Sequence, residues 1–244
     1  MRIDILTLFP EMFDGPLSES ILRQAREKGI LDVRLVNIRD FALDKHRTAD
    51  DYQYGGGSGM VMKPDPVLGA LESVTVEGSM ESTAVVLLSA RGRLFDQATA
   101  LDLSCRSRVV LICGRYKGID ERVLDAVTDE ISIGDYILTG GELGAMIMVD
   151  AVTRLIPGVL GDIESAETDS FYEGILGPPV YTRPEEFHGM RVPEVLLSGN
   201  HERIRRWRRE QALRVTLERR PDLLEKADLT DEDREILREM KAEQ

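Results

Sequence analysis

The sequence predicts an α/β protein: a mostly parallel sheet with helices on both faces, followed by a small helical domain. Two observations support this fold class. Short segments rich in Val, Ile and Leu alternate with helix-like segments as far as Ile156, and from Pro193 the pattern is helical to the end. Strands that alternate with helices favour parallel pairing, because each helix carries the chain back to the same end of the sheet.

Five segments of four to eight residues have the composition of buried strands. Near-continuous apolar runs of this kind are typical of parallel strands that are covered on both faces. The segments are Arg2–Phe9, Leu31–Ile38, Ala84–Ser89, Val109–Cys113 and Glu130–Ile133.

Five further segments have helical patterns. Leu17–Lys28 is followed by Gly29, which suits a helix C-terminus, and Pro66–Val74 follows Asp65, which suits an N-cap. The remaining helical segments are Asp96–Ser104, Ile119–Val127 and Glu142–Ile156.

The stretch from Pro157 to Pro193 has no clean period and contains five prolines. An irregular run of this length is typical of a linker or a functional loop. We therefore expect an α/β domain at 1–160, a linker and active-site loop at 161–192, and a helical domain at 193–244. Within the last of these, Thr230–Asp233 is a variant of the capping box and predicts the start of the final helix.

The composition is that of an ordinary globular protein, with 42% hydrophobic and 31% charged residues. No apolar run approaches the roughly 18–20 residues of a membrane helix, and the N-terminus lacks a signal-peptide pattern. We therefore expect a cytoplasmic protein with no membrane partner. Cys105 and Cys113 give neither a disulfide framework nor a paired metal spacing, and both are expected to be buried.

The net charge of −13 argues, as a sum, against a nucleic-acid partner. The charge is polarised, however. Arg203–Arg220 holds eight arginines against two glutamates, whereas Asp222–Gln244 is acidic. Arginines this dense on an acidic chain favour contact with RNA phosphates over a merely solvated helix face.

Three glycine-containing loops follow consecutive predicted strands: Leu88–Gly92, Cys113–Gly118 and Ser132–Glu142. Ligands bind at the carboxyl ends of parallel strands, and glycine lets backbone groups approach a ligand without a Cβ in the way. The loops predict a small-molecule site in which main-chain groups bind adenine and Ile or Leu packs against its faces. A fourth segment, Asp50–Met60, has four glycines in five positions, which suits a loop that closes over substrate or an exposed connector.

Several motifs follow one another along nearly the whole chain: Ile5–Phe13, Asp44–Asp51, Gly114–Tyr116 with Gly118–Arg122, Ser132–Glu142, Ile156–Gly161, Tyr181–Pro184 and Leu196–His201. In these motifs the sequence resembles the bacterial tRNA (guanine-N1)-methyltransferases of the SPOUT superfamily. The resemblance implies a deep trefoil knot in the α/β domain, an exception to the rule that chains are unknotted. It also implies an obligate homodimer with the tRNA between the subunits.

The resemblance implies that the three loops form the knot and hold S-adenosylmethionine. By position, its binding residues would be Ser89, Gly114, Tyr116, Ser132, Ile133, Gly134, Asp135, Tyr136, Ile137, Leu138, Gly140 and Gly141.

The implied reaction is methyl transfer to N1 of guanosine 37 in tRNA, 3′ of the anticodon. N1 has to lose a proton before it attacks, and negative charge then spreads to O6. The resemblance assigns the base to Asp169 and the cation near O6 to Arg154. The family usually has acids at the positions of Lys117 and Thr168, and these acids are linked to its dependence on magnesium. Because this chain lacks both, whether it requires magnesium stays open.

The resemblance also implies residues that contact tRNA: His46, Arg47, Asp50, Arg183, His201, Arg205, Trp207 and Arg208. An anticodon loop suits such contacts, because proteins recognise unpaired RNA bases that can be splayed out. Two alternatives stay open: methylation of another RNA nucleotide, and a tRNA-binding paralogue without catalytic activity, which Lys117 and Thr168 motivate.

Overall fold

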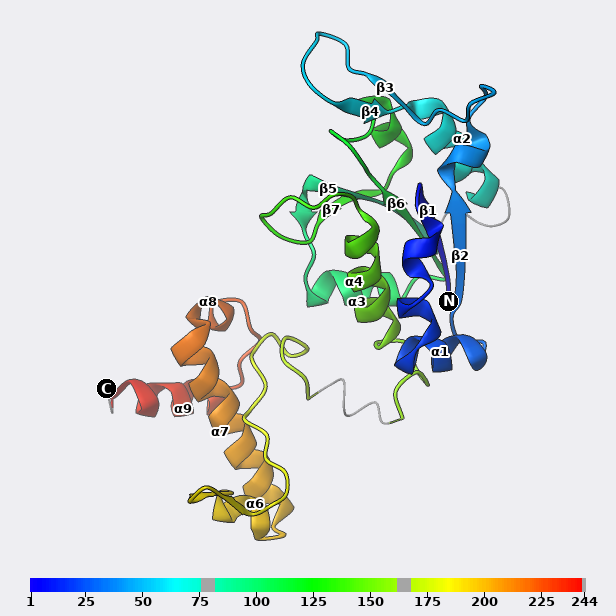
Figure 1. The fold of residues 1–244 in the computed structure, drawn as a ribbon. Helices are drawn as coiled ribbons and strands as arrows, with labels where there is room; N and C mark the ends of the chain where they lie inside the picture. Colours follow the sequence, from blue (N-terminus) through cyan, green and yellow to red (C-terminus); the bar gives the residue numbers. More distant parts are fainter. Residues whose placement is uncertain (76–81, 162–167, 243–244) are drawn as a thin grey trace. The chain divides into compact units, whose positions relative to one another are not determined.

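The computed structural model describes residues 1–75, 82–161 and 168–242. The chain divides into two compact units, Met1–Gly161 and Asp162–Gln244 (Figure 1). Residues 162–167, which belong to the predicted linker, lie outside the described residues.

The first unit is built on a five-stranded sheet with the order β2-β1-β6-β5-β7. All of its pairings are parallel, as the alternation of strands and helices predicts. Each of the five segments expected to be strands belongs to this sheet. The strands are β1 (Arg2–Thr7), β2 (Asp32–Asn37), β5 (Thr83–Leu94), β6 (Arg108–Cys113) and β7 (Asp129–Ser132).

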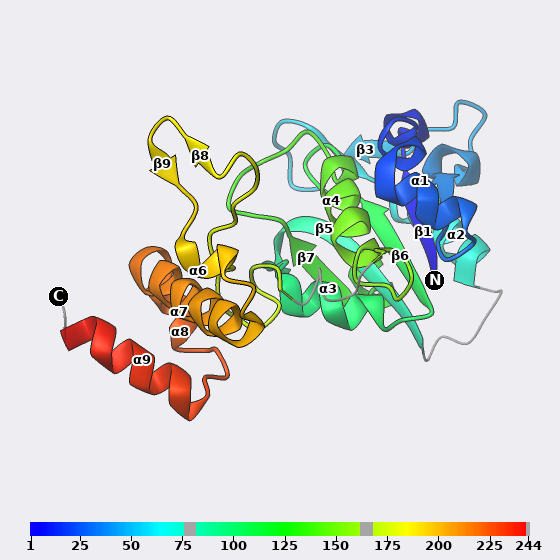
Figure 2. The same ribbon diagram turned by 90° about the horizontal axis from the view of Figure 1, so that it is seen from below.

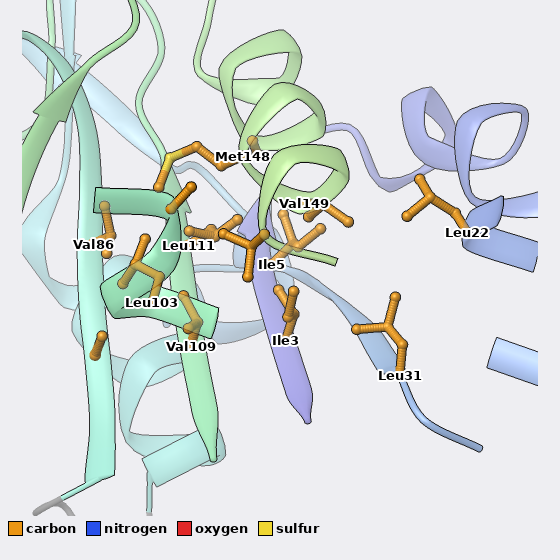
Figure 3. Packing of buried hydrophobic residues seen from close by; sticks show 14 of the residues in the cluster. Ile3, Ile5, Leu22, Leu31, Val86, Leu103, Val109, Leu111, Met148 and Val149 are labelled. Atoms are coloured by element: carbon orange, nitrogen blue, oxygen red, sulfur yellow. The ribbon is translucent and has the colours of Figure 1, made fainter. Parts of the chain in front are cut away.

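One face of the sheet is covered by three helices: α1 (Ser20–Glu27), α3 (Gln97–Ser104) and α4 (Glu142–Thr153). Ile3 and Ile5 of β1 and Val109 and Leu111 of β6 belong to the core on this face, as the two-residue period of a strand requires. Figure 3 shows them with Met148 of α4. The helices α3 and α4 lie side by side in both ribbon views (Figures 1 and 2).

The opposite face is covered by α2 (Pro64–Thr75) and by two 3-10 helices, η3 (Ile38–Phe41) and η5 (Glu121–Ala126). Leu6 of β1 and Val110 and Ile112 of β6 alternate with the residues of the first face and pack here with Val67 of α2. The expected layering, a parallel sheet with helices on both faces, is therefore confirmed.

Three expected helices differ in detail. Ile119–Val127 yields the 3-10 helix η5, which starts after Asp120, whose carboxylate accepts from the Arg122 N–H at 3.0 Å. The helix α2 begins at Pro64, so Asp65 lies in its first turn instead of capping it. The segment expected as Leu17–Lys28 is divided into η2 (Pro16–Ser18) and α1, because Ser20 has a positive φ of 54°. Before these lies a further 3-10 helix, η1 (Pro10–Phe13).

The two cysteines are free and differ in burial. Cys113 is buried as expected, and burial together with the charge of Glu142 raises the pKa of its thiol well above the usual value. Cys105 is exposed, so the expectation was wrong for this residue: it follows the last residue of α3, where the chain leaves the packed helix for β6. None of the described helices is long and apolar enough to cross a membrane.

The described part of the second unit is mainly helical. Its core joins Leu213 with Ile236 and Leu237, and with Ile175 from the preceding irregular segment. Its elements are the short strands β8 (Glu186–Phe187) and β9 (Met190–Arg191) and the helices α6 (Glu194–Leu197), α7 (His201–Arg219), α8 (Pro221–Leu224) and α9 (Asp231–Ala242).

The capping box predicted at the start of α9 is present. The Thr230 N–H donates to Asp233 at 2.9 Å, and the Asp233 N–H donates to the Thr230 hydroxyl at 3.2 Å. Arg209 of α7 donates to both carboxylate oxygens of Asp233, each at 2.8 Å. These hydrogen bonds, those of Arg209 foremost, lower the pKa of the buried Asp233 to about 2. Asp233 therefore caps α9 and ties it to α7.

We expect Asp233→Asn to destabilise the second unit by about 2 kcal/mol, the typical contribution of hydrogen bonds to a charged group. Because the folded-state pKa of Asp233 lies below the usual aspartate value of 3.8, its stabilising effect is complete above that value and is lost as the pH falls toward about 2. Urea titrations from pH 6 to pH 2, followed by the fluorescence of Trp207, the single tryptophan, report on α7.

The matched control is Asp231→Asn, which removes an exposed acid of the same helix that pairs with Arg234 at 3.3 Å. Exposed pairs contribute little, so this variant should unfold close to the wild type. Equal losses in the two variants would contradict the role given to Asp233.

Candidate functional site

Residues within β5 and the loops after β6 and β7 converge on one cavity of about 940 Å³ in the first unit. It lies at the carboxyl ends of these strands, the edge of a parallel sheet where ligands are expected. Eleven of the twelve residues implied to bind the methyl donor line it, and Asp135 does not. The eleven are Ser89, Gly114, Tyr116, Ser132, Ile133, Gly134, Tyr136, Ile137, Leu138, Gly140 and Gly141.

Two of the loops are joined by their backbones. The Gly141 N–H donates to the Gly114 carbonyl at 2.8 Å, and Arg115 and Gly140 form an isolated β-bridge. A Cβ on Gly141 would lie 2.8 Å from Cys113 Cα and 3.0 Å from Gly114 N. Backbone cannot give way as a flexible side chain can, so this contact requires glycine.

The loop from Ser132 to Leu138 presents apolar side chains beside the cavity. Ser132 and Gly134 are hydrogen-bonded to each other through the Ser132 hydroxyl, and the Tyr136 hydroxyl donates to the Ile133 carbonyl at 3.0 Å. Ile137 is 84% exposed, although its side chain is wholly apolar. Side chains of this kind around a concave site suit the faces of a planar apolar ring.

The third loop differs from the expectation. The chain does not leave the sheet after Leu88: β5 continues to Leu94, and its register with β7 shifts between Leu88 and Arg93. The residues between them form an irregularity within a long strand, and Ser89, Ala90 and Arg91 line the cavity. An irregularity of this kind re-aims side chains without ending the strand.

The glycine-rich segment forms a further wall. It contains a two-stranded hairpin, β3 (Asp50–Tyr52) with β4 (Met60–Met62), which the sequence did not predict. The Lys117 N–H donates to the Met60 carbonyl and the Met62 N–H donates to the Gly118 carbonyl, each at 3.0 Å. Gln53, Gly59, Met60 and Val61 therefore line the cavity beside the loop that follows β6.

Two sets of ion pairs, in and behind the cavity wall, could not be predicted from the sequence. Arg91 lies 2.9 Å from Glu121 and 3.6 Å from Glu130, and its hydrogen bond to Glu121 raises the pKa of its guanidinium. Arg115 pairs with the fully buried Glu142 at 3.0 Å. Their partners are distant in sequence, so no local pattern marks them.

Neither of the two residues implied to be catalytic, Arg154 and Asp169, is among the residues that line this cavity. Arg154 is the C-cap of α4, half-buried, whereas the cavity lies at the N-terminal end of that helix. Twelve residues at about 1.5 Å per residue separate the two ends by about 18 Å. Asp169 is exposed and belongs to the second unit, where its carbonyl accepts from the Tyr172 N–H at 3.4 Å.

The residues implied to contact tRNA occur in both units. In the first, His46 and Arg47 are exposed, Arg47 pairs with Asp40 at 2.9 Å, and Asp50 begins β3. In the second, Arg183, His201, Arg205 and Arg208 are exposed, whereas Trp207 is half-buried and lies 6.4 Å from the Tyr181 ring.

A family model described as tRNA (Guanine-1)-methyltransferase TrmD matches residues 1–226. The chain belongs to this family. Three of its curated relatives are proteins named tRNA (guanine-N(1)-)-methyltransferase. The one from Dictyoglomus turgidum is 59% identical over 100% of this chain and 98% of its own. The one from Pelotomaculum thermopropionicum is 59% identical over 99% of this chain and 97% of its own. The one from Geobacter metallireducens is 58% identical over 98% of each chain. The resemblance seen in the sequence is thereby confirmed.

For a member of this methyltransferase family, we expect Gly141→Ala to weaken S-adenosylmethionine binding at least about fivefold, because overpacking typically costs about 1–3 kcal/mol. Isothermal titration calorimetry measures the effect directly. Gly15→Ala is the matched control, since nothing lies within 4 Å of its Cβ position and its φ is −66°. Wild-type affinity in Gly141→Ala would show that the two loops can separate without loss of the site.

Proposed function

We propose that this protein transfers a methyl group from S-adenosylmethionine to N1 of guanosine 37 in tRNA. The cavity carries the proposal, because eleven of the twelve residues assigned to the methyl donor line it. They come from loops far apart in the sequence, so their meeting is a property of the fold. Membership of the family supports the reaction class.

The cavity lining suits the methyl donor. Ile137 and Leu138 offer apolar surface to adenine, while the glycines of the loops leave backbone groups accessible. The volume of about 940 Å³ is within the usual range of about 300–1,000 Å³ for small-molecule sites. S-adenosylmethionine supplies an activated methyl group on its sulfonium, which leaves positioning and proton transfer to the chain.

Asp169 and Arg154 are proposed to carry the proton and charge steps. The Asp169 carboxylate accepts the N1 proton of guanine, and the nitrogen lone pair then attacks the methyl carbon as the bond to sulfur breaks. The Arg154 guanidinium donates to O6, where negative charge develops, and its fork also fits N7.

The place of Arg154 favours an active site shared by two copies of the chain. Its helix separates it by about 18 Å from the cavity of its own chain. Leu143 and Ile147, one turn apart on α4, are 47% and 48% exposed, and α4 contacts η1, which carries the exposed Met12. Monomers rarely expose contiguous apolar patches, so we place the second copy on this face, with the tRNA between the subunits.

We further propose that the loop from Ile133 to Gly141 completes the trefoil knot of the superfamily. Its close backbone packing on Gly114 and Cys113 supports this threading.

The arginines of α7 divide into two sets. Arg206 pairs with Glu210 at 3.0 Å and Arg209 with Asp233 at 2.8 Å. Arg205 and Arg208 have no acidic partner among the described residues. With His201 they have the spacing of one helix face, so we assign this face to tRNA phosphates.

The described residues do not fit a magnesium site at the cavity. Across 1–75, 82–161 and 168–242, no group of three or more His, Cys, Asp or Glu is placed to hold a metal ion. Glu121 and Glu130 of the lining are both within ion-pair distance of Arg91, and Lys117 adds a cation to the same lining. We therefore assign no step of the reaction to magnesium.

The deciding experiment measures methyl incorporation from labelled S-adenosylmethionine into a tRNA transcript with guanosine at positions 36 and 37, with and without magnesium. A transcript with adenosine at position 37 is the control, and an rRNA fragment tests for another target. We expect incorporation that is lost in the control. A folded protein that binds tRNA but consumes no methyl donor would support the paralogue without catalytic activity.

We expect Asp169→Ala and Arg154→Ala each to lower turnover by at least about 100-fold, since general acid–base catalysis contributes about 10²–10⁴-fold and one charge-stabilising donor about 10²–10³-fold. Single-turnover assays measure the loss, and sedimentation confirms the oligomeric state. Arg26→Ala removes a cation of α1 that donates to the Leu17 carbonyl at 2.7 Å, and should leave turnover unchanged. Near-normal turnover in either catalytic variant removes that residue from the mechanism.

A further inference from the structure

Behind the cavity wall lies a buried carboxylate that the proposed mechanism does not use. Glu142 is the first residue of α4 and is fully buried. It accepts from the Thr7 hydroxyl at 2.9 Å and from Arg115 Nε at 3.0 and 3.2 Å. The positive end of the α4 dipole also favours a negative charge at this position. The charge of Glu142 is therefore compensated from three sides despite its burial.

Arg115, like Glu142, contacts several neighbouring side chains. Its guanidinium carbon lies 4.3 Å from the centre of the Phe9 ring, and Nη2 lies 3.2 Å from the Met12 sulfur. The Phe9 N–H in turn donates to the Thr7 hydroxyl at 3.0 Å. The pair thus joins the end of β1 and η1 to the two loops that meet at the cavity.

The pair is continuous with the backbone that lines the cavity. Arg115 follows Gly114, and Glu142 follows Gly141, the two residues joined by the 2.8 Å hydrogen bond. A Cβ on Gly140 would overlap both Arg115 Nε and Glu142 Oε2, so the pair fills the space directly behind that loop. The ion pair therefore adds a side-chain link between the two loops to their backbone hydrogen bond.

We propose that Glu142 and Arg115 are positioning residues for S-adenosylmethionine, which set the spacing of the Gly114 and Gly140–Gly141 loops. The inference rests on the proposed function, because it takes the cavity to be the methyl-donor site. In the ligand-free protein, the spacing of the two loops then depends on this ion pair in addition to their backbone hydrogen bond.

A second buried ion pair of the same sheet provides the matched control. Asp4 is fully buried and accepts from Arg108 at 2.7 Å across β1 and β6. It lies near the amino ends of these strands, whereas the cavity lies at their carboxyl ends. Asp4→Asn and Glu142→Gln therefore remove equivalent charges at opposite ends of the sheet.

The test combines hydrogen exchange without ligand and calorimetric titration with S-adenosylmethionine. We expect Glu142→Gln to speed exchange in peptides covering 114–118 and 134–141, and to weaken binding about tenfold, the factor that corresponds to the loss of one charge-assisted hydrogen bond. Asp4→Asn should lower the melting temperature but leave both readouts at wild-type values. Arg115→Lys, which keeps the charge but shortens the donor set, should retain more affinity than Arg115→Gln.

Unchanged exchange and affinity in Glu142→Gln would overturn the proposal, as would equal changes in Asp4→Asn. If Glu142→Gln does not fold, Thr7→Val, which removes one donor to the same carboxylate, should give the same changes on a smaller scale, and their absence would equally overturn it. A wild-type protein that binds no S-adenosylmethionine would contradict the proposed function, while the exchange data would still decide whether the pair holds the loops.

Discussion

The hydrogen bond from the Gly141 N–H to the Gly114 carbonyl joins the loop that follows β6 to the loop that leads into α4. Parallel pairing places the carboxyl ends of β5, β6 and β7 at one edge, but it does not by itself bring their loops into contact. Contact requires backbone to approach backbone, and a side chain on Gly141 would prevent that. The cavity, the start of α4 and therefore the position of Arg154 all depend on this approach.

Two buried ion pairs at opposite ends of the same sheet have different roles: one links two strands, and the other links two loops. Asp4 and Arg108 link β1 to β6 within the strands themselves. Glu142 and Arg115 link segments that have already left the strands. Burial of charge is costly in both places, and replacement by apolar residues is often neutral or stabilising elsewhere. A pair whose loss would change only stability can be replaced by packing, whereas a pair that spaces two binding loops cannot.

The sheet and its crossovers could be predicted from the sequence, because strands such as Val109–Cys113 carry their pattern locally. The hairpin around Asp50–Tyr52 could not, since three residues show no alternation and its pairing is completed by contacts with Gly118. The role of Glu142 could not either, because Thr7 lies 135 residues away and Arg115 lies 27 away. The loops of the cavity could be predicted from their glycines. A binding site needs glycine where backbone groups approach closely, and this requirement is visible in the sequence alone.

A net charge of −13 is compatible with an RNA substrate, because the charges of the chain are not evenly paired. Affinity for phosphates depends on cations that are not already neutralised, so the sum over the chain matters less than the pairing of each arginine. In α7, Arg206 and Arg209 are bound to acids, and Arg209 ties the helix to α9 through the buried Asp233. Arg205 and Arg208 alternate with them along the helix and remain exposed. An acidic protein can thus present a basic face, because the helical period separates arginines that are paired with acids from arginines that are not.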